Sequence, residues 1–429
     1  MPEFTIKVDQ NRYLPVGGRE VHAIVTVEAT GAGAAAAATS AAEVIIIDTS
    51  GSMSFGDKMA EAKRAAKAAV DVLRDGVRFA VVAGFNLARP VYPADETLAV
   101  ASPQTREEAK RAIGRLDASG GTAIGSWLRM AHKLMSRHGA GVRHAILLTD
   151  GKNQHETPAE LDAALAEVNG GFVCDCRGVG TDWEVAELRK IASAMLGSVD
   201  IVADPRDLEA DFRAMAEKAM GKAVADVALR VWTPQNGTVK FLKQVAPSLE
   251  DLTGRRVESA PQSGDYPTGT WGDEIRDYHL CVQVPPSDVG RQMRAAWVKL
   301  VVPDGAGGEQ VLASGNVLAE WTDDEAKSTQ INPRVADYTG QAELAAAIQE
   351  GLAARREGDV DTATARLGRA VVLARQAGNE QIGRLLERVV DVIDPVTGTV
   401  RLKKNVDKVD EMSLDTRSTK TVRTRKDGG

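Results

Sequence analysis

A buried strand in this chain ends in a group of oxygen-bearing side chains. The segment VIIIDTSGSMS, residues 44–54, runs from four apolar residues into Asp48, Ser50 and Ser52. One carboxylate and two hydroxyls on a single loop suit a hard divalent cation, above all Mg²⁺. The same residues also suit a helix cap, because Asp and Ser accept hydrogen bonds from the first backbone N–H groups of a helix. Taken alone, the segment leaves both interpretations open.

Two further loops supply oxygen atoms. Thr122 lies in DASGGTAIG, between a pair of glycines and a helical pattern, and Asp150 ends the apolar strand of LLTDGKNQ. In a doubly wound sheet the loops after the strands meet at one edge, where such folds bind ligands. Asp150 before a glycine also suits a simple turn, and Asn86, after another strand, either borders the site or is a surface residue. The three loops together favour metal binding over capping.

These three loops resemble the von Willebrand factor A family. The letters DTSGS at residues 48–52 match its D-x-S-x-S motif, and Thr122 and Asp150 match its second and third motifs in order. The resemblance implies a metal-ion-dependent adhesion site. In that site Ser50 and Ser52 bind the metal directly, and Thr122 joins them in one conformation. The two aspartates act directly or through water.

The resemblance also implies a function. In that family the ion, here expected to be Mg²⁺ with Mn²⁺ or Ca²⁺ as alternatives, keeps an open position that a carboxylate of a partner protein fills. The residues supply a physical reason, because only two carboxylates face a double charge, and if neither binds the ion directly the ion stays electrophilic. We therefore expect a non-enzymatic protein-binding module whose partner offers an Asp or Glu. The family layout further implies a bacterial stress or signalling assembly.

A second hypothesis is an enzyme. A strand-end aspartate beside Mg²⁺ is also how phosphatases that form an aspartyl-phosphate begin, with Asp48 as the nucleophile. Those enzymes need a second carboxylate two residues later as acid, base and ligand, and Ser50 holds that place here. The substitution disfavours a phosphatase-like hydrolase.

The elements that must position these loops alternate between strand and helix from residue 42 to 221. Continuous apolar runs such as EVIIID and HAILLTD predict a mostly parallel, Rossmann-like sheet covered by helices on both faces, a doubly wound α/β fold. In 1–40 and 223–325 apolar and polar residues alternate with a period of two between turns, which predicts an antiparallel β-sandwich. We therefore expect the α/β domain, 42–221, to be inserted in that sandwich.

The C-terminal part differs from both. Residues 337–393 predict a helical hairpin broken at REGDVD. Residues 395–429 are polar, basic and rich in threonine, and predict a flexible tail. Its threonines resemble kinase substrates that a forkhead-associated domain would bind once phosphorylated, with a solvated basic tail as the alternative. These residues are Thr416, Thr419, Thr421 and Thr424.

Composition limits the remaining function classes. Apolar residues make up 43% of the 429 residues and charged residues 26%, typical of a globular protein. No apolar run approaches the roughly 18 residues of a membrane-spanning helix, and the N-terminus does not resemble a signal peptide, so we expect a cytoplasmic protein without a membrane role. The net charge is −7, and residues 401–427 carry nine basic against five acidic residues. The remainder thus carries −11, which disfavours nucleic acid.

The cysteines and histidines predict no second site. Three cysteines, an odd number, argue against a disulfide framework. Cys174 and Cys176 lie two residues apart on a predicted strand and are interpreted as buried thiols rather than metal ligands. The six histidines show no clustered ligand spacing, and we assign none of them to a metal.

Overall fold

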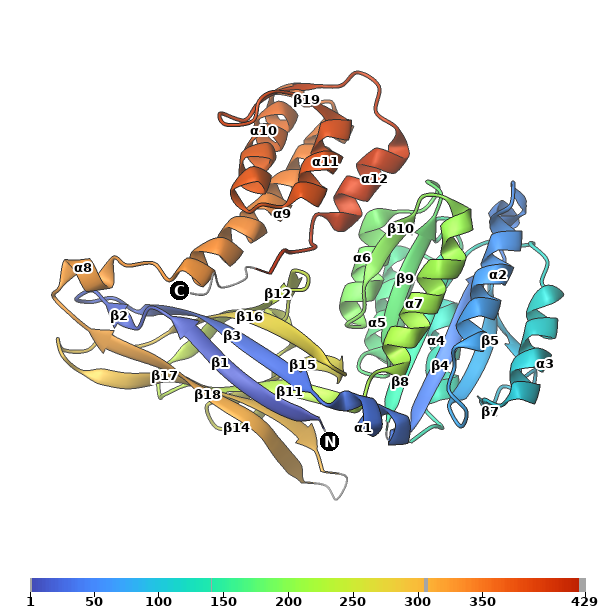
Figure 1. The fold of residues 1–429 in the computed structure, drawn as a ribbon, viewed down its shortest axis with the longest axis horizontal. Helices are drawn as coiled ribbons and strands as arrows, with labels where there is room; N and C mark the ends of the chain where they lie inside the picture. The colour runs from blue at the N-terminus through green and yellow to red at the C-terminus, as the bar shows by residue number, and fades with distance from the viewer. Residues whose placement is uncertain (1, 140, 305–307, 424–429) are drawn as a thin grey trace. The chain divides into compact units, whose positions relative to one another are not determined.

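The computed structural model describes residues 2–139, 141–304 and 308–423, and the chain divides into two compact units. The first contains residues 31–225 and 270–272. The second contains residues 2–30, 226–269 and the chain from 273 onward. The first unit is the α/β part of the chain, and the second holds the antiparallel sheets and the C-terminal helices (Figure 1).

The first unit is built on a sheet with the strand order β10-β9-β8-β4-β5-β6. The strands that pair in parallel are β4 (Ala41–Asp48), β5 (Arg78–Gly84), β8 (Val142–Thr149), β9 (Val173–Val179) and β10 (Val199–Val202). Two short strands, β6 (Ala88–Tyr92) and β7 (Ala99–Val100), pair antiparallel with β5. The helices are α1 (Ala32–Ala38), α2 (Lys58–Asp71), α3 (Pro103–Gly114), α4 (Ile124–Met135), α5 (Pro158–Val168), α6 (Val185–Ala194) and α7 (Leu208–Met220).

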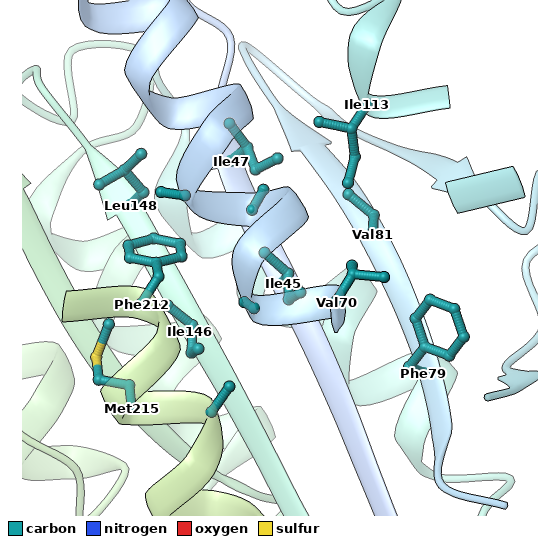
Figure 2. Packing of buried hydrophobic residues seen from close by; sticks show 14 of the residues in the cluster. Ile45, Ile47, Val70, Phe79, Val81, Ile113, Ile146, Leu148, Phe212 and Met215 are labelled. Carbon is teal, nitrogen blue, oxygen red and sulfur yellow. The ribbon is translucent and has the colours of Figure 1, made fainter. Parts of the chain in front are cut away.

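The central strand β4 is buried along its whole length. Ile45 and Ile47 lie in one hydrophobic core with Val70 of α2 and Phe212 of α7 (Figure 2). Because side chains alternate across a strand, Ile46 is buried on the opposite face of the sheet, where α4 contacts β4 and β5. Cover on both faces explains why the strand is a continuous apolar run rather than an alternating one.

The second unit contains two mostly antiparallel sheets, with the orders β1-β3-β16-β12-β13 and β14-β15-β11-β17-β18-β2, in which only the short edge strand β2 is seen to pair parallel, with β18. The strands are β1 (Glu3–Gln10), β2 (Tyr13–Leu14), β3 (Glu20–Thr30), β11 (Val224–Trp232), β12 (Thr238–Ala246), β13 (Glu250–Asp251), β14 (Val257–Ala260), β15 (Ser263–Trp271), β16 (Glu274–Gln283), β17 (Gln292–Pro303) and β18 (Glu309–Trp321). The N-terminal strand β3 pairs with β16, which follows the α/β unit in the sequence. The predicted fold class, a doubly wound sheet inserted in an antiparallel sandwich, is confirmed.

The C-terminal helices form a larger group than the predicted hairpin. They are α8 (Glu325–Ser328), α9 (Pro333–Glu357), α10 (Val360–Gln376), α11 (Glu380–Val389) and α12 (Lys408–Arg417), with the hairpin β19 (Val390–Asp394) and β20 (Thr399–Leu402). Leu344 of α9, Leu386 of α11 and Leu414 of α12 share one hydrophobic core. Helices long enough and apolar enough to cross a membrane are absent from the described part of the chain.

The prediction of a flexible tail from residue 395 is wrong for residues 395–423. Val400 and Leu414 are buried in the helical core, and the Gln341 side chain makes hydrogen bonds of 2.8 Å to both backbone groups of Val422. Thr416 is buried and donates its hydroxyl to the Met412 carbonyl. The tail composition is polar, but a few widely spaced apolar residues suffice to fix it on the helices. Thr424 lies outside the described residues.

Candidate metal site

The structure brings the loops after β4 and β8 together. The two strands are parallel neighbours, so their carboxyl ends meet at one edge of the sheet. From β4 the chain passes first to β5 on one side and later to β8 on the other. This edge between β4 and β8 is therefore a switch point of the topology, where open α/β sheets form their ligand crevices. Asp48 ends β4, and Asp150 follows β8 directly.

Backbone hydrogen bonds join the first loop to the second. The Gly51 N–H donates to the Gly120 carbonyl at 2.9 Å, and the Ser119 N–H donates to the Thr49 carbonyl at 2.6 Å. The Gly121 N–H donates to Asn86 Oδ1 at 2.8 Å. Asn86 therefore borders the site as a support of the second loop.

His155 fixes Thr122 in the same way from the third loop. The Thr122 N–H donates to His155 Nδ1 at 3.2 Å, and the His155 N–H donates to the Thr122 carbonyl at 2.9 Å. This role of His155 is not apparent from the sequence, because His155 lies 33 residues from Thr122 and outside the three motifs.

The hydroxyl oxygens lie at distances that suit a small hard cation. Ser50 Oγ and Ser52 Oγ are 3.0 Å apart, and two ligands at right angles around Mg²⁺, each about 2.1 Å from the ion, also lie about 3.0 Å apart. Ser52 Oγ donates to Asp150 Oδ1 at 2.6 Å. A methyl group placed on Gly151 would lie 3.4 Å from Ser52 Oγ and 3.5 Å from Thr122 Oγ1. The hydroxyls of the first two loops and the Asp150 carboxylate of the third therefore border one space.

Asp48 is buried next to this space, and both of its carboxylate oxygens accept hydrogen bonds. Its Oδ1 accepts the Ser50 N–H at 2.7 Å, and its Oδ2 accepts the Thr149 hydroxyl at 2.6 Å. Burial raises the pKa of Asp48 to about 6, against the lowering effect of these hydrogen bonds. Ser50 precedes the short 3₁₀ turn Gly51–Ser54 without a capping side-chain hydrogen bond. The helix-cap interpretation of this loop is therefore wrong for Ser50.

A cation of the chain itself reaches Asp150. Lys58, the first residue of α2, donates from Nζ to Asp150 Oδ2 at 2.7 Å and lies 3.6 Å from Asp182 Oδ2. The Asp150 side chain is fully buried, and that of Lys58 is 16% exposed. Asp150 thus shares its carboxylate between the Ser52 hydroxyl and an ammonium group. No motif residue points to Lys58, although it lies only six residues after Ser52.

The donor set fits a hard divalent cation. Direct oxygen ligands are available from Ser50, Ser52, Thr122 and Asp150, and Asp48 holds the first loop from behind. These are hydroxyl and carboxylate oxygens, which suit Mg²⁺, Mn²⁺ or Ca²⁺ better than a soft metal.

The sulfur and nitrogen ligands lie elsewhere. Cys174 and Cys176 are buried, with their sulfur atoms 4.0 Å apart, and the hydrogen bond between them together with burial raises the pKa of Cys174. In the described residues one group of metal-type side chains does occur, at Glu20, His22 and Cys281 in the second unit. His22 therefore lies among side chains with metal-ligand chemistry, although the histidines show no ligand spacing along the sequence.

Comparisons with known proteins agree with this fold. Residues 42–201 match the von Willebrand factor type A domain, and residues 372–418 match the von Willebrand factor type A C-terminal domain. The chain is 53% identical to a solved von Willebrand factor type A protein from Catenulispora acidiphila, with a TM-score of 0.94 over 99% of this chain and 98% of that one. The ArnB paralog VWA2 from Sulfolobus acidocaldarius shares the fold at 15% identity, with a TM-score of 0.57 over 97% and 98% of the two chains. A comparison with curated proteins gave no match.

Proposed function

The chain belongs to the von Willebrand factor type A family, whose domains commonly act as metal-dependent protein-interaction modules, and we propose that it binds a protein partner through a divalent cation. The cation, Mg²⁺ in the first instance, is held at the edge between β4 and β8. A carboxylate of the partner completes its coordination. The assembly is a bacterial stress or signalling complex in the cytoplasm.

The state of Asp48 supports the partner-binding role. Both of its oxygens accept hydrogen bonds from the chain, so Asp150 is the carboxylate with oxygens directed toward the hydroxyl ligands. Neutral hydroxyls and one carboxylate leave a divalent ion with net positive charge, and such an ion favours an additional anionic oxygen. An Asp or Glu of a partner supplies that oxygen.

The same observation weighs against a phosphatase-like hydrolase. A nucleophilic aspartate needs a free oxygen that reaches the phosphorus atom. Asp48 is buried, with one oxygen on the Ser50 N–H and the other on the Thr149 hydroxyl. Ser50 cannot replace a second carboxylic acid as proton donor and acceptor at neutral pH.

Metal titration of the full chain tests the first step. Isothermal titration with Mg²⁺, or Mn²⁺ followed by electron paramagnetic resonance, should show one oxygen-ligated site in the wild type. Asp150→Asn and Ser50→Ala should weaken binding strongly, because each removes a direct ligand. Ser54→Ala is the matched control, since its exposed hydroxyl donates to the Gly51 carbonyl on the same loop and it should bind as the wild type does. Equal affinity in all four proteins would contradict the assignment.

Partner capture tests the second step. The wild type and Ser50→Ala, each immobilised, should be exposed to lysate of the native cell in Mg²⁺ and in EDTA. A partner retained by the wild type in Mg²⁺ and lost in both other conditions fits the proposal. Replacement of its exposed Asp and Glu residues should then identify one carboxylate without which binding fails. A partner that is retained equally in EDTA and by Ser50→Ala would contradict metal-dependent adhesion.

A further inference from the structure

Three side chains with metal-ligand chemistry meet on one face of the sheet that contains β3 and β16. Glu20 and His22 lie two residues apart on β3, so they point to the same face. Cys281 on β16 is the antiparallel partner of His22, and directly opposite residues also share a face. The register of two strands therefore assembles a group whose members lie 259 residues apart in the sequence.

The ligand atoms are close to the spacing of a tetrahedral metal site. His22 Nε2 lies 3.8 Å from Cys281 Sγ and 3.9 Å from Glu20 Oε2, and all three ligand atoms lie within 4.8 Å of one another. Bonds of about 2.3 Å to sulfur and about 2.0–2.1 Å to nitrogen and oxygen place tetrahedral ligands about 3.4–3.6 Å apart. The Glu20 and His22 side chains are 41% and 39% exposed, so they have room to move closer to Cys281.

A second histidine holds the His22 ring in the required orientation. His279 Nε2 lies 3.1 Å from His22 Nδ1, and metal-binding histidines commonly use their second ring nitrogen in such a hydrogen bond. Phe241 packs edge-on against His279, with ring centroids 4.9 Å apart. In the tautomer in which His22 Nδ1 carries the proton, His279 Nε2 accepts this hydrogen bond. The lone pair of His22 Nε2 then faces Cys281 and Glu20.

The charges around the group also suit a divalent ion. Cys281 is fully buried, and Lys240 binds Glu20 through Oε1, which leaves Oε2 facing His22. A metal that binds here displaces the thiol proton of Cys281 to solvent, so the thiolate and the Glu20 carboxylate both face the ion, while Glu20 stays paired with the Lys240 ammonium.

We propose that Glu20, His22 and Cys281 form a zinc-type transition-metal site, with His279 as a positioning residue for His22 and the fourth coordination position open to water. Its nitrogen and sulfur ligands select a softer ion than the oxygen ligands between β4 and β8. The site lies in the second unit and does not depend on the adhesion function proposed above.

Cobalt spectroscopy of the full-length, reduced and chelator-treated protein tests this site. Co²⁺ should produce a thiolate-to-cobalt charge-transfer band in the near ultraviolet, and one equivalent of Zn²⁺ should remove it. Cys281→Ser should abolish the band, and His22→Gln should weaken Zn²⁺ binding at least 100-fold. His279→Phe should weaken it about 10–100-fold, the usual effect of removing such a support. Zn²⁺ should raise the thermal midpoint of the wild type and leave that of His22→Gln unchanged.

Two controls make the assignment specific. Cys174→Ser and Cys176→Ser remove the other thiols, and both variants should keep the band. His22→Gln changes a partly exposed residue, so circular dichroism will confirm that this variant is folded even if Cys281→Ser is not. The proposal is overturned if the wild type shows no thiolate band. It is also overturned if the band survives Cys281→Ser or His22→Gln and disappears in Cys174→Ser.

Discussion

Removal of the Lys58 ammonium should tighten metal binding at the proposed adhesion site. Lys58 Nζ lies 2.7 Å from Asp150 Oδ2, and Asp150 is the carboxylate that the metal would share. In the protein without metal, the Lys58 ammonium thus neutralises the Asp150 carboxylate, the negative charge to which a divalent cation would bind. Lys58→Met keeps most of the apolar length of the side chain and removes its charge and its hydrogen bond to Asp150.

The size of the effect follows from the charges. Two unit charges about 4 Å apart interact with about 1 kcal/mol in water, and more in a partly buried site. The double charge of Mg²⁺ raises its repulsion by one ammonium to about 2 kcal/mol, or about 30-fold in the dissociation constant. We therefore expect Lys58→Met to bind Mg²⁺ about 30-fold more tightly at low ionic strength, where screening is weakest.

Stability without metal should change in the opposite direction. Asp150 is fully buried, and loss of Lys58 leaves its Oδ2 without the paired charge. Breaking a buried ion pair from one side costs about 3 kcal/mol or more. Lys58→Met should therefore unfold at lower urea concentration in EDTA, and saturating Mg²⁺ should raise its stability more than that of the wild type.

Titration calorimetry and urea denaturation, each with and without Mg²⁺, measure both effects. Lys63→Met is the matched control, because Lys63 lies on the same helix and its Nζ reaches the Gly114 carbonyl rather than the metal loops. The electrostatic reasoning is refuted if Lys58→Met binds Mg²⁺ no more tightly than the wild type, or if Lys63→Met shows the same gain. A wild type that binds no divalent cation would instead refute the metal site itself.

Three further substitutions test the framework. Burial opposes charging of His144, but Glu43 raises its pKa to about 10; this exceeds the value of about 6.5 in an unfolded chain. The resulting stabilisation is complete below about pH 6.5 and is lost as the pH rises to about 10. The urea midpoint of the wild type should therefore decrease as the pH is raised from about 7 to about 9.5, and that of His144→Gln should decrease much less. Leu414→Ala should cost about 2–5 kcal/mol in urea denaturation, because it opens a cavity in the helical core; a negligible loss would mean that α12 is not held there. Gly84→Ala would place a methyl carbon 2.4 Å from the Trp127 ring, and calorimetry should show a lower melting temperature, with a loss of about 1–3 kcal/mol; an unchanged midpoint would contradict this packing.

The sequence predicts that these oxygen-bearing side chains meet, because strand ends and motif residues coincide. Asp48 and Asp150 each end an apolar run, and parallel strands place such ends at one edge whatever the details of the loops. The contribution of Lys58 was not predictable in this way. Whether the Lys58 side chain reaches Asp150 depends on the path of the backbone, which is set by the 3₁₀ turn at Gly51–Ser54 and by Gly56 with its φ of +59°.

The Glu20–His22–Cys281 group was missed for a different reason. Ligand spacing along one segment can be read from a sequence, but His22 and Cys281 meet only through the antiparallel register of β3 and β16. A shift of one residue in that register would turn Cys281 to the other face of the sheet. The ordered tail was missed because composition averages over the chain, whereas Val400 and Leu414 bind it to the helices individually.

The two candidate sites bear on how metal dependence must be interpreted. EDTA would remove both a hard ion from the β4–β8 edge and a soft ion from the β3–β16 face, so loss of partner binding in EDTA would not identify which site holds the partner. Ser50→Ala affects only the oxygen site, and His22→Gln affects only the nitrogen and sulfur site. If adhesion uses the oxygen site, Mg²⁺ should restore binding to chelated His22→Gln and fail to restore it to Ser50→Ala. The reverse pattern, with recovery in Zn²⁺ alone, would move the binding function to the second unit.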